Sequence, residues 1–155
     1  MEKVILCGEI IPVLSLALRG AVKSIEVAMY EWAWYQGQHS GLVQDINRVV
    51  CTKAKAGIPV SVVLHTEAKG RPLYAINRKT ESALKQYGAE VRWGWAGVPV
   101  HAKVWIIDRR MVIAGSHNIS TRAARLNHEV SVMFDNPAEV ERSVKWWSDL
   151  WAKAR

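Results

Sequence analysis

Short runs of strand-forming residues alternate with amphipathic helical patterns along the chain, and this alternation most limits the folds available to it. The runs at residues 24–30, 59–64 and 130–134 are rich in β-branched and other apolar residues, as is typical of buried strands. Residues 41–56 carry apolar side chains at helical spacing, and Gly57 follows as a stop signal. The alternation predicts an α/β domain in which helices pack on a sheet.

The other elements expected from the pattern complete this architecture. Further strands are expected at residues 4–6, 91–95, 100–107 and 111–114, the last two as a hairpin, and further helices at residues 12–20, between 72 and 87, and from 137 onward. Asn136 and Pro137 suit the N-cap and first position of the last helix, and Ser120 suits the N-cap of a short helical turn. With 155 residues and no repeat or linker, the chain is expected to form a single domain over residues 1–155.

Basic residues outnumber acidic ones. Lys and Arg number 21 against 14 Asp and Glu, a net charge of +7 at pH 7. This balance favours a polyanionic partner, either nucleic acid or anionic lipid. Half of the residues are hydrophobic, which excludes a disordered chain. The longest apolar stretches are shorter than the roughly 20 residues of a membrane-spanning helix, so we expect no membrane span.

The two cysteines and the N-terminal region point to a reducing compartment. Cys7 and Cys51 have neither a CxxC spacing nor paired histidines nearby, so we expect two reduced, buried thiols and no zinc site. Residues 10–18 have the length of the apolar part of a signal peptide, but Glu9 adjoins them and they continue into a helix-then-strand pattern. We therefore expect no cleaved signal and a cytoplasmic location.

His101 and Lys103 form the most informative pair. They lie two residues apart in a predicted strand, and side chains at that spacing share one face, roughly 6–7 Å apart. An imidazole and an ammonium group on one face suit a phosphate. The first is a nucleophile or proton carrier, and the second is a fixed positive charge.

The same spacing recurs twice after the predicted hairpin. Ser116 and Asn118 offer neutral hydrogen-bond donors, and Asn127 and Glu129 follow on the next extended segment. The carboxylate of Glu129 is of a kind that orients an imidazole. Three neighbouring segments thus contribute polar groups within an otherwise apolar region.

These residues together resemble the signature of the phospholipase D superfamily, HxKxxxxD followed by GSxN and a later glutamate. The matching positions are His101, Lys103, Asp108, Gly115, Ser116, Asn118 and Glu129. The resemblance runs almost end to end. The chain is similar to the small bacterial endonucleases that carry one copy of this signature, the HKD motif, per chain. The resemblance implies a phospholipase D-like mixed β-sheet flanked by helices.

The resemblance also implies a mechanism. Family members cleave a phosphodiester through a phosphohistidine and use two histidines, so a chain with one motif implies a homodimer that brings two copies of His101 together. By resemblance Lys103, Ser116 and Asn118 bind the phosphate oxygens, and Glu129 holds the imidazole tautomer. Asp108 is assigned a structural, salt-bridging role beside the structural Gly115. No metal or cofactor is implied.

The substrate stays open at this stage. An endonuclease acting on DNA or RNA is favoured by size and charge; a phospholipase or cardiolipin hydrolase is the alternative, and an inactive nucleic-acid-binding dimer is a third hypothesis. Candidate backbone-binding cations are Lys69, Arg71, Arg122 and Arg125. Candidate rings for base stacking are Trp32 and Trp34 in the predicted loop at residues 31–40, and Trp95. Packing in the core or at a dimer interface is the more common role of tryptophan, and we prefer it to stacking.

Overall fold

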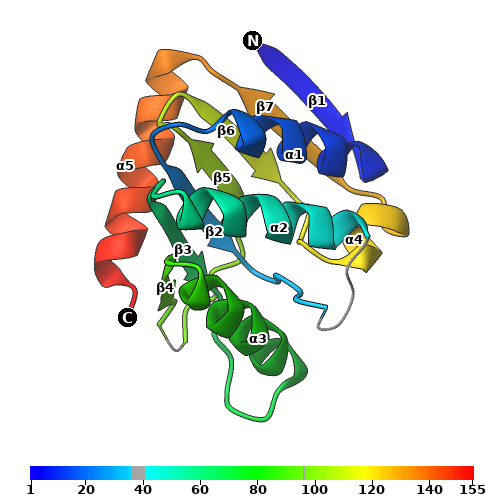
Figure 1. The fold of residues 1–155 in the computed structure, drawn as a ribbon, viewed down its shortest axis with the longest axis vertical. Coiled ribbons are helices and arrows are strands. Elements are labelled where there is room, and N and C mark those ends of the chain that lie inside the picture. The colour runs from blue at the N-terminus through cyan, green and yellow to red at the C-terminus, as the bar shows by residue number, and fades with distance from the viewer. Residues whose placement is uncertain (36–40, 96) are drawn as a thin grey trace.

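One mixed sheet of seven strands organises the chain (Figure 1). The computed structural model describes residues 1–35, 41–95 and 97–155. The sheet has the order β1-β7-β6-β5-β2-β3-β4. Its strands are β1 (Glu2–Leu6), β2 (Ile25–Met29), β3 (Val60–Leu64), β4 (Glu90–Trp93), β5 (Lys103–Ile107), β6 (Met111–Gly115) and β7 (Val130–Phe134).

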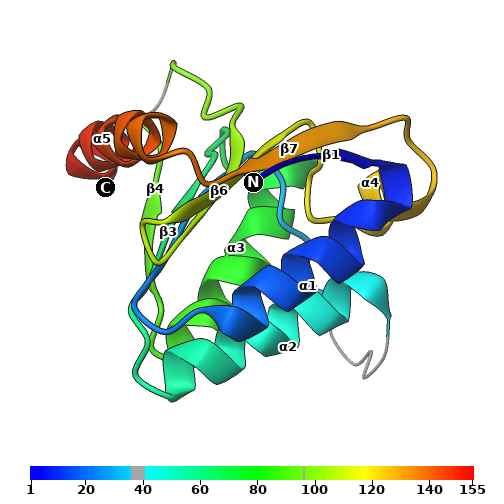
Figure 2. The ribbon, with the colours of Figure 1, turned by 90° about the horizontal axis from the view of Figure 1, so that it is seen from above.

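Helices cover both faces of this sheet. In Figure 2, α1 (Ile10–Gly20), α2 (Leu42–Lys55) and α3 (Pro72–Gln86) lie on one side, and α5 (Pro137–Lys153) lies on the other. The short η1 (Cys7–Glu9) and α4 (Thr121–Arg125) lie at the end of the sheet that receives the C-terminus of β1. No helix in the described parts of the chain is both long and apolar enough to cross a membrane. The predicted α/β architecture, a mixed sheet flanked by helices, is confirmed.

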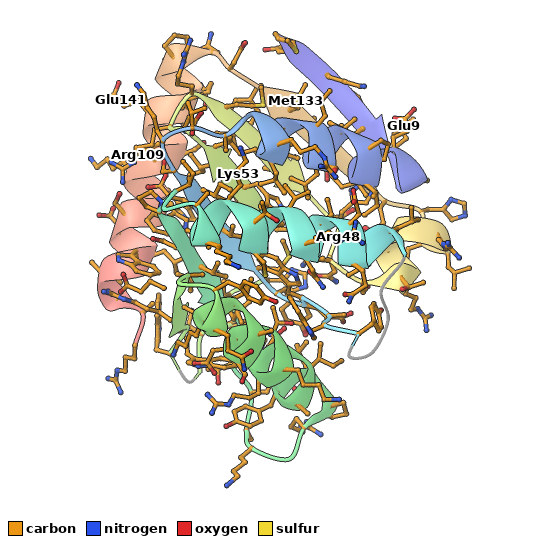
Figure 3. The ribbon with its side chains drawn as sticks, viewed as in Figure 1. Glu9, Arg48, Lys53, Arg109, Met133 and Glu141 are labelled. Carbon is orange, nitrogen blue, oxygen red and sulfur yellow. The ribbon has the colours of Figure 1, made fainter. Side chains whose placement is uncertain are left out.

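The side chains of β2 are buried on both faces of the sheet. Ile25, Val27 and Met29 pack in the larger core beneath α1 and α2, as their alternation predicted. Ala28 points into the second core beneath α5, where Trp147 is also buried. Met133 of β7, labelled in Figure 3, belongs to the same larger core as Ile25, Val27 and Met29.

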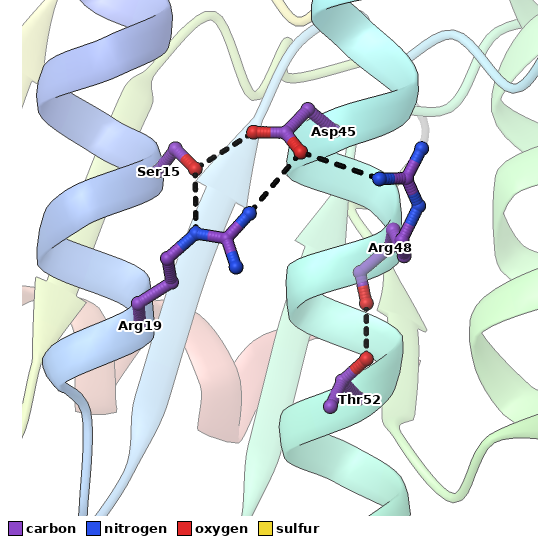
Figure 4. A network of polar contacts seen from close by, with 5 residues as sticks. All are labelled: Ser15, Arg19, Asp45, Arg48 and Thr52. Atoms are coloured by element: carbon purple, nitrogen blue, oxygen red, sulfur yellow. Dashed lines mark hydrogen bonds and ion pairs between the residues drawn. The ribbon is translucent and has the colours of Figure 1, made fainter. Parts of the chain in front are cut away.

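A polar network joins α1 to α2 above the larger core (Figure 4). The carboxylate of Asp45 accepts hydrogen bonds from Ser15 Oγ at 2.8 Å and Arg19 Nη2 at 3.2 Å, and it pairs with Arg48 Nη1 at 3.5 Å. Lys53, labelled in Figure 3, donates to the Arg19 carbonyl oxygen at 2.6 Å, close to the C-terminus of α1. These contacts hold the two helices side by side over the sheet.

Strand directions bring five strand ends to one edge of the sheet. β2 runs parallel to β3 and antiparallel to β5, while β6 lies between β5 and β7 and runs antiparallel to both. The C-terminal ends of β2, β3 and β6 therefore meet the N-terminal ends of β5 and β7. The motif residues follow or precede these ends.

The first strand of the predicted hairpin is shorter than expected. β5 begins at Lys103 rather than at residue 100, so His101 precedes the strand. The reason is that β2 ends at Met29, which pairs with Lys103, and one further hydrogen bond, from Tyr30 N–H to the Ala102 carbonyl at 3.0 Å, closes the ladder. The shared-strand geometry predicted for His101 and Lys103 is therefore wrong, although the two side chains are still neighbours.

The two cysteines differ in environment. Cys51 is buried in α2, and burial raises the pKa of its thiol to about 11. Cys7 is exposed, so the prediction that it is buried is wrong. It lies in η1 with a φ of 46°, where the chain turns away from the end of β1.

The last helix begins as the sequence predicted. Asn136 Oδ1 accepts hydrogen bonds from the backbone of Ala138 at 3.1 Å and Glu139 at 3.3 Å. Trp147 and Trp151 lie one turn apart with ring centroids 5.1 Å from each other. They fix the helix on the sheet beneath it.

Gly115 allows β6 to approach β7, which leads to a stability prediction. A Cβ at this position would overlap Ser131 Oγ and the Val130 carbonyl oxygen, which is part of the backbone. We expect Gly115→Ala to lower the free energy of unfolding by about 1–3 kcal/mol, measured by urea denaturation. Gly20→Ala is the matched control, because a Cβ there meets no atom within 4 Å. It should leave stability unchanged or raise it by up to about 1 kcal/mol, and equal effects of the two substitutions would contradict the steric explanation.

Candidate active site

His101 and Lys103 are in contact at the edge of the sheet. Lys103 Nζ donates to the His101 carbonyl oxygen at 2.7 Å and lies 3.3 Å from Nε2 and 3.4 Å from Nδ1 of its ring. The imidazole is exposed, whereas the lysine side chain is buried, with 7% of its surface accessible. An accessible ring thus lies directly beside a partly desolvated ammonium group.

The environment of Lys103 favours an anionic ligand. Burial lowers the pKa of its ammonium group, and the carboxylates of Glu129 and Glu31 act in the opposite direction. Among the described residues no carboxylate lies within ion-pair distance of Nζ. An anion that reached Nζ would therefore pair with a cation that has lost part of its hydration.

Asn118 is oriented by the segment that leaves β2. Its Oδ1 accepts a hydrogen bond from the Glu31 N–H at 3.3 Å, which leaves the amide NH2 group available as a donor. The next residue, Ile119, donates its N–H to the Glu31 carbonyl at 3.0 Å and accepts from Ala33 N–H at 2.7 Å. The backbone of residues 31–33 thus fixes the segment that carries Asn118.

Ser116 and Glu129 are paired with each other. Ser116 Oγ donates to the Glu129 carboxylate and accepts from the Val130 N–H at 3.1 Å, and Asn127 Nδ2 donates to the other carboxylate oxygen at 2.9 Å. Within the described residues no hydrogen bond joins Glu129 to His101. In this chain Ser116 and Asn127 donate to the carboxylate, and the role of Glu129 in holding the imidazole tautomer stays a prediction.

Two aromatic residues that the motif did not include complete the site. Tyr30 and His65 directly follow β2 and β3, and their rings stack at 4.8 Å between centroids. The Tyr30 ring also lies 4.6 Å from the His101 ring and 4.7 Å from Lys103 Nζ. The signal that could have found them is their place at the C-terminal ends of two predicted buried strands.

His65 is held by the backbone around it. Its Nδ1 accepts a hydrogen bond from the Val100 backbone N–H at 3.3 Å, and the His65 backbone N–H donates to the Met29 carbonyl at 3.0 Å. Burial lowers the pKa of the imidazole; Glu67 opposes this effect, while His101 and Lys103 reinforce it. His65 is thus a buried ring that disfavours the charged form.

Asp108 lies far from these residues, at the turn between β5 and β6. Its carboxylate accepts the backbone N–H groups of Val22 at 3.0 Å, Lys23 at 2.7 Å and Ser24 at 3.0 Å. Burial by itself would raise the pKa of this carboxyl, but the three N–H groups outweigh it and hold the pKa below its ordinary value. The predicted ion pair is replaced by backbone hydrogen bonds, which tie the hairpin to the start of β2.

Trp32 is not placed to contact a substrate, so its candidate role in base stacking is wrong. This side chain is fully buried, its Nε1 donates to Asn47 Oδ1 at 2.7 Å, and its ring lies 4.9 Å from that of Trp105. It therefore packs in the core, the preferred interpretation, and cannot stack on a substrate. Trp34 is half-buried against the same core, and Trp95 is half-buried near the strand end of β4. Residues 36–40 of the predicted loop lie outside the described residues.

The candidate backbone-binding cations lie on two sides of the site. Lys69 and Arg71 are exposed in the segment between β3 and α3, and Arg122 and Arg125 are exposed on α4. None of the four makes a hydrogen bond to His101, Lys103, Ser116, Asn118 or Glu129. Among the described residues no group of three or more His, Cys, Asp or Glu side chains is placed to hold a metal ion.

The buried His65 leads to a prediction for the pH dependence of stability. Because its folded-state pKa lies below the ordinary value of 6.5, the unfolded chain binds the proton more readily. This contribution is fully present above pH 6.5 and is lost as the pH falls through the folded-state pKa. We expect the free energy of unfolding to fall from pH 7 to pH 5 by less in His65→Asn, which keeps an acceptor near Nδ1, than in the wild type. Urea denaturation at both pH values measures this, and an unchanged difference would contradict it.

Comparisons with known sequences bear on the family. The family model described as "Cardiolipin synthase, PLD-like domain" matches residues 14–151. Cardiolipin synthase A of Yersinia pseudotuberculosis serotype O:1b (strain IP 31758) is 24% identical over 92 residues, which are 59% of this chain and 19% of that protein. The chain thus spans about a fifth of the length of the curated relatives it matches.

Comparisons with solved structures bear on the fold. Nuc from Salmonella typhimurium, described as a phospholipase D family member, superposes with a TM-score of 0.81 at 21% identity and covers 100% of this chain and 97% of its own. NucT from Helicobacter pylori has a TM-score of 0.81 at 19% identity, with 99% and 97% covered. The HKD-type residues around His101, the mixed sheet and the family match agree, and the chain belongs to the phospholipase D superfamily.

Proposed function

We propose that this chain is a nuclease that hydrolyses phosphodiester bonds through a phosphohistidine on His101. The observation that carries the proposal is the contact between the accessible His101 ring and the buried Lys103 ammonium group, at 3.3–3.4 Å. The unprotonated nitrogen of an imidazole is a nucleophile, and the neighbouring cation attracts the phosphate that it attacks. The anchored amide of Asn118 adds a neutral donor at the same edge of the sheet.

The reaction has two steps. A ring nitrogen of His101 forms a bond to phosphorus, the bond to the leaving oxygen breaks, and a second imidazole gives that oxygen its proton. The second imidazole then takes a proton from water, whose oxygen attacks phosphorus and releases His101. Lys103 and Asn118 stabilise the charge on the phosphate oxygens, a task that metal ions perform in other nucleases. Ser116 would contribute its hydroxyl after leaving the Glu129 carboxylate.

A second copy of the chain would supply the second imidazole. An apolar patch on the sheet supports this: Val4 and Leu6 of β1 pair with Val132 and Val130 of β7, and all four side chains are exposed. The patch adjoins the strand end that carries Glu129. A two-fold dimer that buried it would bring two copies of this edge together.

Nucleic acid is the favoured substrate because of charge. The net charge of +7 and the exposed Lys69, Arg71, Arg122 and Arg125 suit a polyanionic backbone on either side of the site. The matched family model and relatives carry the name cardiolipin synthase, which makes a phospholipid phosphodiester the alternative. An inactive nucleic-acid-binding dimer is the third hypothesis, and loss of turnover in a His101 variant separates it from the first two.

The first prediction concerns His101. Purified protein should cleave single-stranded DNA, double-stranded DNA or RNA in excess EDTA, and His101→Ala should lower that rate by about three orders of magnitude or more while binding persists. His128→Ala is the matched control, because this exposed histidine makes none of the contacts described above. It should retain wild-type activity.

Each other outcome has a defined meaning. Cleavage of anionic phospholipid vesicles with untouched nucleic acid would establish the lipid alternative. Cleavage that needs added metal, or that survives in His101→Ala, would overturn the phosphohistidine mechanism. Binding of nucleic acid without any turnover would favour the inactive dimer.

The second prediction concerns the apolar patch. Val132→Lys places a charge among exposed apolar side chains and should raise the dimer dissociation constant at least about 10-fold, with activity falling in parallel. Light scattering after gel filtration, together with the nuclease assay, measures both quantities. Leu16→Lys is the control, since this exposed leucine lies on α1, on the other face of the sheet. A monomer with full activity would contradict the dimeric site.

A further inference from the structure

We propose that Tyr30 is a positioning residue for His101, and that its ring, packed against His65, sets the orientation of the imidazole. This role rests on the proposed function, in which His101 is the nucleophile. Neither Tyr30 nor His65 belongs to the HxKxxxxD and GSxN motifs. Both are placed beside the reacting group only by the fold.

The Tyr30 ring contacts both His101 and Lys103. Its centroid lies 4.6 Å from that of His101, with the ring planes at 59°, and 4.7 Å from Lys103 Nζ. The same ring stacks on His65 at 4.8 Å and 22°. Tilted and stacked arrangements at these distances are favourable for aromatic pairs. Ring contacts thus link the buried His65, the half-buried Tyr30 and the exposed imidazole of His101.

The backbone that carries Tyr30 and His65 is itself held by hydrogen bonds. Asn77 of α3 is fully buried, and its Nδ2 donates both to the Tyr30 carbonyl at 2.8 Å and to the His65 carbonyl at 3.0 Å. The Tyr30 N–H donates to the Ala102 carbonyl at 3.0 Å, between His101 and Lys103. The Asn77 side chain therefore fixes the backbone of Tyr30 relative to that of His65. The backbone hydrogen bond to Ala102 fixes Tyr30 beside the segment that carries His101.

The hydrogen bonds around His101 do not orient its ring. Lys103 Nζ lies almost equally far from the two ring nitrogens, at 3.3 and 3.4 Å, so it selects neither. Glu129, the carboxylate expected to do so, is engaged by Ser116 and Asn127. Among the described residues, the ring contact with Tyr30 is the interaction left to favour one rotamer of His101. A loosened imidazole would still bind phosphate through Lys103 but would attack phosphorus less often.

Tyrosine variants test this role. We expect Tyr30→Leu to lower kcat by about 10-fold or more with little change in KM, because orientation and not binding is lost. Tyr30→Phe keeps the ring and should restore kcat to within about twofold of the wild type. Tyr74→Leu is the matched control: Tyr74 also stacks on an aromatic ring, that of Trp93 at 5.9 Å, but away from His101.

A spectroscopic measurement reports on position without any substrate. In protein labelled with ¹³C-histidine, the His101 ring signal is assigned by its absence in His101→Ala. We expect the aromatic ring at position 30 to cause a ring-current shift of that signal in the wild type and in Tyr30→Phe. In Tyr30→Leu the signal should remain but the ring-current shift should be lost. An unchanged shift in Tyr30→Leu, or an equal kcat in Tyr30→Leu and wild type, would overturn the positioning role.

Failure of the positioning role can be separated from failure of the proposed function. If the wild type cleaved no phosphodiester, the proposed function would fail, and the His101 signal would still decide whether Tyr30 orients the ring. If Tyr30→Leu did not fold, His65→Ala removes the inner support of the stack while Tyr30 stays in place. His65→Ala should shift the His101 signal and lower kcat, as expected for Tyr30→Leu. If His65→Ala changed neither the signal nor kcat, the proposal would be overturned.

Discussion

Strand β2 is the element on which the rest of the molecule depends. It is buried on both faces and pairs in parallel with β3 and in antiparallel with β5. It therefore joins the parallel part of the sheet, β2 to β4, to the part with antiparallel pairings, β5 to β7 and β1. The pairing of Met29 with Lys103 sets where the ladder ends. Because the ladder ends there, Tyr30 lies opposite Ala102 and the His101 side chain extends beyond the sheet.

Directly after β2 the chain crosses the interior without regular structure. Side-chain amides of buried asparagines form hydrogen bonds with the backbone of this segment. Asn77 accepts the Trp32 N–H at 3.0 Å in addition to its two donated bonds, and Asn47 donates to the Ala33 carbonyl at 3.2 Å. Buried polar groups of the main chain are costly unless they are paired. These side chains therefore stabilise a segment that a sheet ladder does not reach, and the same segment orients Asn118. Stability and the geometry of the candidate site rest on the same hydrogen bonds.

Much of the fold could be predicted from local pattern. The period of apolar residues located the buried strands and the long helices, and Asn136 and Ser120 marked two helix starts by their capping chemistry. The bounds of β5 were missed because a strand end depends on the length of its neighbour, which local pattern does not contain. The exposure of Cys7 was missed for a similar reason, since it follows from a turn at the end of an edge strand.

The sequence by itself determined the family and the chemical types of the site, since imidazole, ammonium and amide groups at short, regular spacings need no fold to be recognised. Only the tertiary structure decided their partners. It turned Glu129 toward Ser116 and Asn127, buried Trp32, and brought Tyr30 and His65 to His101 from strands far away in the chain. The physical reason is that hydrogen bonds and ring contacts between segments distant in sequence depend on strand order and register, and these emerge only when the whole sheet is assembled.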